Sequence, residues 1–164
     1  MSGIIGKSNL HSGLLGSIGG GQVVYQYGHN TNADGNSAMN GNWQVVTHAT
    51  ITVPSSIVSI CSRISVFWAA HALIYKGSSH HFCGFRMYRS SPSATQIGQK
   101  INTGANNHTS HQPFYGAYSL LVTDLSLVPG SDHVYRVEKM SNAVYAGDVS
   151  GAQDGGCISV WGIK

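Results

Sequence analysis

The chain has 164 residues, the size of a single domain, and only 9% of them are charged, against about 25% in an average soluble domain. Glycine contributes 21 residues and hydrophobic residues 41%, which excludes a disordered chain of low hydrophobicity and high charge. The formal charge of +3 is spread thinly, without the dense basic stripe of a nucleic-acid binder. These totals favour a turn-rich, all-β protein that buries much of its surface in an assembly.

Residues 1–21 are predicted to form an extended docking arm. The phrase SGIIG recurs ten residues later as SGLLG, and three consecutive glycines end at Gly21. Glycine on both sides of each aliphatic pair frees the backbone and leaves the pair exposed. Exposing such side chains to water is unfavourable, so we expect them to contact another protein. The candidate partner-binding residues of the arm are Ile4, Ile5, Leu14 and Leu15.

After the arm, apolar residues recur with period two. A short strand is predicted at 22–27, followed by a polar loop up to Gly41. The strand predicted at 42–53 places Trp43, Val45, Thr47, Ala49, Ile51 and Val53 on one face. A turn over Pro54-Ser55-Ser56 leads into a long apolar run at 57–75, with Val58, Ile60, Ile64, Val66, Trp68 and Ala70 on one face. Because most strands are much shorter, a bulge is expected within this run. Arg63 and His71 interrupt it, so it does not qualify as a membrane span.

The second half of the chain continues the same pattern. Strands are predicted at 79–90, 95–101, 117–128, 132–140, 143–149 and 156–163, and the longest polar loop covers 102–116. Helical periodicity occurs nowhere over a useful length. Eight or nine regularly spaced strands without a helix predict a jelly-roll β-sandwich over residues 22–164.

The loop at 102–116 is the candidate surface-binding segment of the body. His108 and His111 lie three residues apart in it, and Phe114 and Tyr115 follow near its end. Exposed aromatic rings among histidines could stack on a sugar ring or contact a neighbouring subunit, whereas simple packing within the loop is the alternative.

The sequence lacks the residue patterns of a metal centre. His81 and Cys83 alternate on one strand, and histidines around a trimer axis could meet, but no motif supplies the four ligands of a structural zinc site. We therefore expect no metal and no cofactor. Cys61, Cys83 and Cys157 show no CxxC spacing and are expected to be reduced.

The sequence also contains few of the residue patterns that catalysis requires. The GxSxG nucleophile motif is absent, and the only acids that flank a strand near His133 are Asp124 and Asp132. Six acidic residues in total leave little material for the paired carboxylates of a glycoside hydrolase. We expect a protein that is not an enzyme.

Four segments resemble the small jelly-roll virion proteins of tailed bacteriophages, a group common in aquatic phage genomes. They are SGIIGKS…HSGLLGS in the arm, TITVPSSIVSICSRISVFWAA at 50–70, HHFCGFRMYRSSPS at 80–93 and GGCISVWGIK at 155–164. Where the family has an acidic residue near its end, this chain has Gly162. More distantly, the layout is similar to the tumour-necrosis-factor and complement globular jelly rolls.

The resemblance implies a homotrimer located in the virion and assembled in the host cytoplasm. The main expectation is a capsid decoration, or cement, protein whose arm binds the major capsid protein and stabilises the shell. The alternative is a tail-fibre knob whose arm enters a tail attachment protein and whose loops recognise a host surface glycan. Neither nucleic acid nor a membrane is an expected partner.

Overall fold

The computed structural model describes residues 22–31, 42–74, 81–105, 114–141 and 156–164. Within these residues it contains eight strands and one short helix. The elements are β1 (Val23–Thr31), β2 (Gln44–Val53), α2 (Ser55–Val58), β3 (Arg63–Ile74), β4 (His81–Ser91), β5 (Thr95–Ala105), β6 (Phe114–Asp124), β7 (His133–Ser141) and β8 (Gly156–Ile163). The predicted arm at 1–21 and the predicted strand at 143–149 lie outside the described residues.

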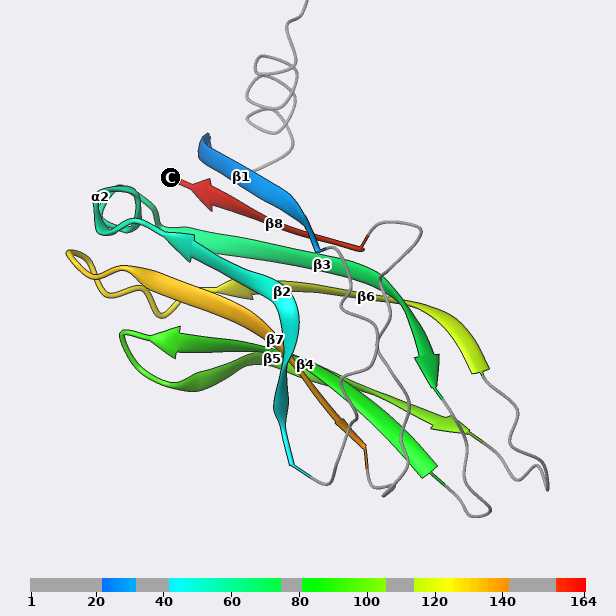
Figure 1. Ribbon diagram of the computed structural model, residues 1–164. Helices are drawn as coiled ribbons and strands as arrows, with labels where there is room; N and C mark the ends of the chain where they lie inside the picture. The colour runs from blue at the N-terminus through cyan, green and yellow to red at the C-terminus, as the bar shows by residue number, and fades with distance from the viewer. Residues whose placement is uncertain (1–21, 32–41, 75–80, 106–113, 142–155) are drawn as a thin grey trace, which may run out of the picture.

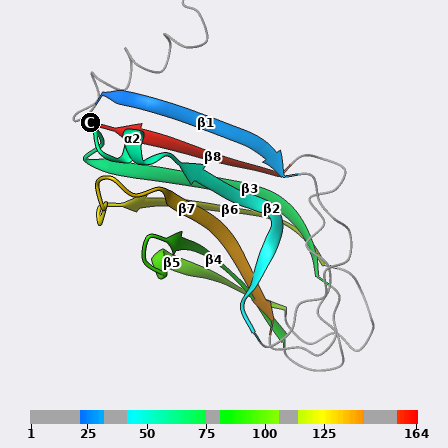
Figure 2. The same ribbon diagram turned by 60° about the vertical axis from the view of Figure 1, so that its left-hand side comes forward.

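The strands form two four-stranded antiparallel sheets packed face to face (Figures 1 and 2). The first sheet has the order β1-β8-β3-β6 and the second the order β2-β7-β4-β5. Only β4 and β5 are consecutive strands that pair with each other, and every other connection crosses from one sheet to the other. This arrangement is that of a jelly roll, as the sequence predicts.

The core lies between the sheets and consists of the alternating apolar positions of both. Trp68 of β3 and Phe85 of β4 are fully buried, and their rings lie 5.2 Å apart across the sandwich. Further apolar side chains with no more than 2% exposure include Ile51, Val53, Val58, Ile64, Met87, Tyr135 and Ile158. On β3, Ile64, Val66, Trp68 and Ala70 are buried, which confirms the predicted face over this part of the run.

The apolar run predicted as one strand from residue 57 to 75 is instead a helical turn followed by a strand. α2 begins after Pro54, whose carbonyl oxygen accepts hydrogen bonds from Ile57 N and Val58 N. The turn buries Val58 completely but leaves Ile60 49% exposed. A short apolar run of this kind fits a helical turn as well as a strand, and only its packing against the sheets decides between them.

The face predicted for β2 is wrong at its first half. His48 has a φ of 59°, and the pairing with β7 shifts register between Val45 and Thr50. Positive φ is uncommon outside glycine and marks the irregularity directly. As a result Val45 is 40% exposed while Val46 is buried, and the predicted inward phase holds only for Ala49, Ile51 and Val53.

The point where the chain enters β1 and the strand ends that border residues 106–113 lie at opposite ends of the sandwich. Lys164 N donates a hydrogen bond to Gln22 O at 2.9 Å, so the point where the chain enters β1 lies beside the C-terminus, near α2 (Figure 1). The strand ends that border residues 106–113 lie at the opposite end of the sheets. The described chain therefore enters β1 at the end of the sandwich opposite the strand ends that border residues 106–113.

Gly162 allows the segment after α2 to pack closely on the first sheet. It shares an inward-facing row with Tyr25 and Ile64. A Cβ atom here would lie 2.6 Å from Cys61 Sγ and 3.1 Å from Tyr25 Cβ. The acidic side chain that the phage family carries near its end therefore has no room at this position.

We expect Gly162→Ala to lower the free energy of unfolding by about 1–3 kcal/mol, because the methyl group overpacks this contact. Cys61→Ala removes the sulfur atom, so Gly162→Ala should cost less in the Cys61→Ala background. A double-mutant cycle from denaturant unfolding measures this coupling. Equal costs in both backgrounds would show that the sulfur atom does not set the constraint.

Candidate functional site

The residues that the sequence singles out for binding fall largely outside the described part of the chain. This applies to Ile4, Ile5, Leu14 and Leu15 of the arm and to His108 and His111 of the loop. The prediction that Phe114 and Tyr115 lie in the loop is wrong. Both belong to β6, where their backbones pair with Ile74 and Leu73, because the strand begins three residues earlier than the alternation suggested. The predicted loop is thus shortened at both ends, since β5 extends to Ala105.

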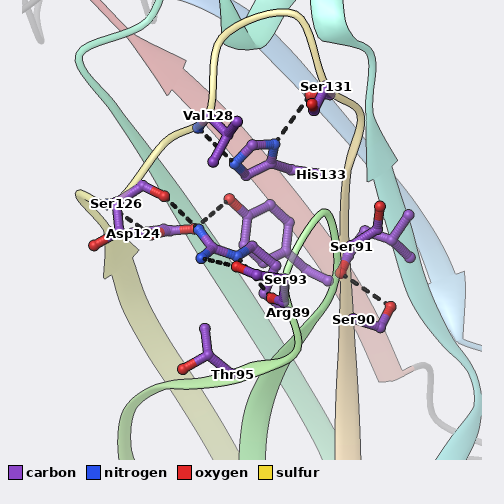
Figure 3. A network of polar contacts seen from close by, with 12 residues as sticks. Arg89, Ser90, Ser91, Ser93, Thr95, Asp124, Ser126, Val128, Ser131 and His133 are labelled. Carbon is purple, nitrogen blue, oxygen red and sulfur yellow. Dashed lines mark hydrogen bonds and ion pairs between the residues drawn. The ribbon is translucent and has the colours of Figure 1, made fainter.

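A buried polar cluster joins the two sheets near the end that carries α2 (Figure 3). Arg89 of β4 and Asp124 of β6 form an ion pair at 2.6 Å, with side chains that are 4% and 2% exposed. The same Asp124 oxygen accepts a hydrogen bond from Tyr135 Oη at 2.8 Å, and its other oxygen accepts one from Ser126 N at 2.9 Å. Arg89 also donates to Ser126 O and to the side chain of Ser93.

His133 lies beside this cluster with both ring nitrogens engaged. Val128 N donates to Nε2 at 3.3 Å, so Nε2 carries no proton and Nδ1–H donates to Ser131 O at 3.1 Å. The ring is fully buried and holds the connection between β6 and β7 in place.

This cluster has the composition of an active site but the geometry of a structural clamp. Its carboxylate, guanidinium and imidazole groups already have partners within the protein, and all are nearly inaccessible to solvent. Burial, followed by the nearby charge of Asp124, raises the pKa of Tyr135 far above its usual value. The cluster links β4, β6 and β7, which belong to different sheets.

The outer face of the first sheet is a better candidate for function, because its central rows hold no charged side chain between Arg63 at one end of β3 and His71 near the other. Three rows of residues cross this face, two of them over all four strands. They are Gln26, Trp161, Ser65 and Thr123; then Gly28, Ser159, Phe67 and Leu121; then Cys157, Ala69 and Ser119. We call these eleven residues the uncharged face. Leu121 is 70% exposed at its edge, and Leu125, just beyond β6, is 72% exposed.

The outer face of the second sheet is different in character. Arg86, Tyr88, Arg136 and Glu138 lie side by side on β4 and β7, and Trp43 lies against Arg86. Exposed Lys100 of β5 adds a further positive charge to this sheet. Since both faces belong to one domain, the overall scarcity of charge does not explain why the uncharged face holds no charged side chain.

The described residues offer no metal centre. Among them, no group of three His, Cys, Asp or Glu side chains is close enough to hold an ion. The described cysteines Cys61 and Cys157 are half-buried and free. Within the same residues, the helical segment is too short and too polar to cross a bilayer.

No protein-family model matches the chain, and no curated protein sequence does. Among solved structures it is similar to a chain of infectious bursal disease virus, Gx strain, at 15% identity and a TM-score of 0.44, over 85% of this chain and 34% of that one. A second similar chain comes from T=1 particles derived from that virus, at 14% identity and a TM-score of 0.41, over 86% and 37%. The chain thus spans about a third of the length of these viral proteins.

Neither the buried ion pair nor the Arg86–Glu138–Arg136 cluster on the outer face of the second sheet was predicted from the sequence. A signal for the pair existed: Arg89 continues the inward phase of Phe85 and Met87, and Asp124 continues that of Leu120 and Val122. Charges in phase with a core-facing stripe are expected to pair when buried. The partner itself could not be named, since 35 residues separate the two in the chain.

Tyr135 should make stability fall at alkaline pH. Its folded-state pKa is raised above the usual value of 10.0, so above that pH the unfolded state loses a proton that the folded state keeps. Stability from this group is complete below pH 10 and decreases as the pH rises, with a slope of about 1.4 kcal/mol per pH unit. We expect Tyr135→Phe to cost about 1–2 kcal/mol at neutral pH and to flatten the alkaline decline.

Denaturant unfolding of the wild type and of Tyr135→Phe between pH 8 and pH 11 measures both effects. Tyr88→Phe, on the outer face of the same sheet, is the matched control and should leave the alkaline slope unchanged. Parallel declines for the wild type and Tyr135→Phe would contradict the assignment.

Proposed function

We propose that the chain is a virion structural protein, a homotrimeric decoration protein of a tailed-bacteriophage head. In this proposal the uncharged face joins the subunits, and the arm at 1–21 binds the major capsid protein. The observation that carries it is the contrast between the two outer faces of the jelly roll. The sequence resemblance to phage virion proteins supports the same role.

The composition of the uncharged face suits contact between subunits better than contact with water. Between Arg63 at one end of β3 and His71 near the other, its rows hold no ionisable side chain except the thiol of Cys157. The centre of a protein interface is depleted in charge and enriched in aromatic residues, and Phe67 and Trp161 occupy the two inner strands of this face. Exposed edge strands usually carry charges that prevent pairing with other chains, and β6 presents Leu121 instead.

The arrangement of the ends supports the proposed orientation. The arm enters β1 beside α2 and the C-terminus, and the strand ends that border residues 106–113 lie at the opposite end. A subunit held to the shell by its arm would present those strand ends away from it. Many subunits on one particle would multiply the modest affinity of each aliphatic pair.

A tail-fibre knob that recognises a host surface glycan is the second candidate. The exposed cations and half-buried aromatic rings of the second sheet favour it, because that face could meet a polar ligand. The number of copies per particle separates the two candidates: hundreds for decoration, a handful for fibres.

Leu121→Glu tests the uncharged face. The side chain is 70% exposed in the single subunit, so the folded subunit should tolerate the change. A carboxylate buried without a partner at the interface should weaken association by about 2–5 kcal/mol, which is at least a 30-fold change. Sedimentation velocity should show a trimer for the wild type and a monomer for the variant. Gln96→Glu, which introduces the same carboxylate at an exposed position of the second sheet, should remain trimeric. A variant Leu121→Glu of unchanged size would refute the interface.

Deletion of residues 1–18 tests the arm. Because the body contains the complete core, the truncated protein should stay folded and trimeric, and it should lose binding to undecorated particles. Co-sedimentation with particles measures the binding, and circular dichroism checks the fold. Binding at full affinity without these residues would show that the arm is not the anchor.

A further inference from the structure

The outer face of the second sheet contains a cluster in which two arginines share one carboxylate. Glu138 Oε2 accepts hydrogen bonds from Arg86 Nε at 2.8 Å and Nη2 at 2.5 Å. Glu138 Oε1 accepts one from Arg136 Nε at 2.9 Å and lies 2.7 Å from Arg136 Nη2. Each carboxylate oxygen is thus occupied by one guanidinium, and the Glu138 side chain is only 4% exposed.

This cluster has an excess of positive charge. Two guanidiniums and one carboxylate give a net charge of +1. The other carboxylates among the described residues are engaged elsewhere: Asp124 binds Arg89, and Asp132 accepts a hydrogen bond from Ser55 N. Partial burial makes an uncompensated charge costly, and an anionic ligand would remove that cost.

The arginines are held in place by aromatic rings. The Arg86 Cζ atom lies 4.2 Å from the centre of the Trp43 ring and 4.8 Å from that of Tyr88. The Arg136 Cζ atom lies 5.2 Å from the centre of the same Tyr88 ring. A guanidinium stacked on a ring keeps its edges available for hydrogen bonds while its plane is fixed.

The guanidinium N–H groups that Glu138 does not use determine which kind of ligand could bind to the two arginines. Both arginines use Nε and Nη2 on Glu138, and within the described part of the chain no bond to either Nη1 group is present. The side chains of Arg86 and Arg136 are 19% and 32% exposed, so a ligand at the surface can reach them. Planar oxygen pairs are the acceptors that guanidinium edges bind best.

We propose that Arg86, Arg136, Trp43 and Tyr88 form a binding site for a carboxylate-bearing saccharide. The carboxylate pairs with the free guanidinium edges, and the half-buried aromatic rings contact the apolar face of the sugar. This goes beyond the proposed assembly role, and it depends on neither the arm nor the uncharged face.

The test uses the full-length protein and two matched pairs of probes. One pair is a galacturonic acid tetrasaccharide and its methyl ester, and the other is sialyllactose and lactose. Titration calorimetry should show that at least one acidic probe binds ten times or more tightly than its neutral match. Sodium acetate should bind at least ten times more weakly than that probe. Equal binding within both pairs, no binding by any probe, or equal binding by acetate would each overturn the proposal.

Variants separate the site from general attraction to a basic protein. Arg136→Gln should weaken the acidic probe about 10–100-fold, since it removes charge-assisted hydrogen bonds. Arg136→Lys keeps the charge but loses the planar edge, and it should still weaken binding several-fold. Glu138→Gln should strengthen binding, because Glu138 competes with the ligand for the same guanidiniums. Should Glu138→Gln fail to fold, the two Arg136 variants decide the question.

Lys100→Gln is the matched control, since it removes an exposed positive charge from the same sheet. It should change the affinity less than twofold, and a loss equal to that of Arg136→Gln would overturn the proposal. Leu121→Glu should bind the probe as the wild type does. Failure of the saccharide test is therefore distinct from failure of the proposed assembly role, which is read from subunit association.

Discussion

The buried ion pair between Arg89 and Asp124 is the interaction on which the two-sheet arrangement most depends. Its partners come from different sheets, and each is nearly inaccessible to solvent. Removing one partner would leave the other charged in the core, at a cost of about 3–5 kcal/mol. Tyr135 Oη and Ser126 N donate further hydrogen bonds to the Asp124 carboxylate, so both of its oxygens have partners within the protein. The pair therefore specifies how the sheets meet at the end where the chain enters and leaves the body.

Because this ion pair connects the two sheets from the inside, the outer faces of the sandwich can differ in charge. The core rows and the buried cluster connect the two sheets from the inside of the sandwich. One face has no charged side chain in its central rows, and the other places Arg86 and Arg136 around Glu138. In the proposed role the first face contacts other subunits, and the second remains accessible to solutes at the particle surface.

The predictions from sequence were most successful where one periodicity covered a whole strand. On β3 the alternation places Ile64, Val66, Trp68 and Ala70 in the core, as the burial confirms. They failed where the backbone departs from the regular pattern. The positive φ of His48 shifts the phase of β2, and the turn after Pro54 converts part of an apolar run into α2. Both departures depend on packing against distant strands.

The sequence by itself determined the all-β class, the jelly-roll architecture and the scarcity of charge, because these follow from local alternation, turn residues and composition. Only the tertiary structure decided which side chains meet. Arg89 pairs with Asp124 because their strands face each other across the sandwich. Arg86 pairs with Glu138, 52 residues further along the chain, because β4 and β7 are neighbours in one sheet. It also decided that the uncharged side chains gather on one face. Alternation tells which residues share a side of a strand, whereas strand order and register decide which strands present that side together.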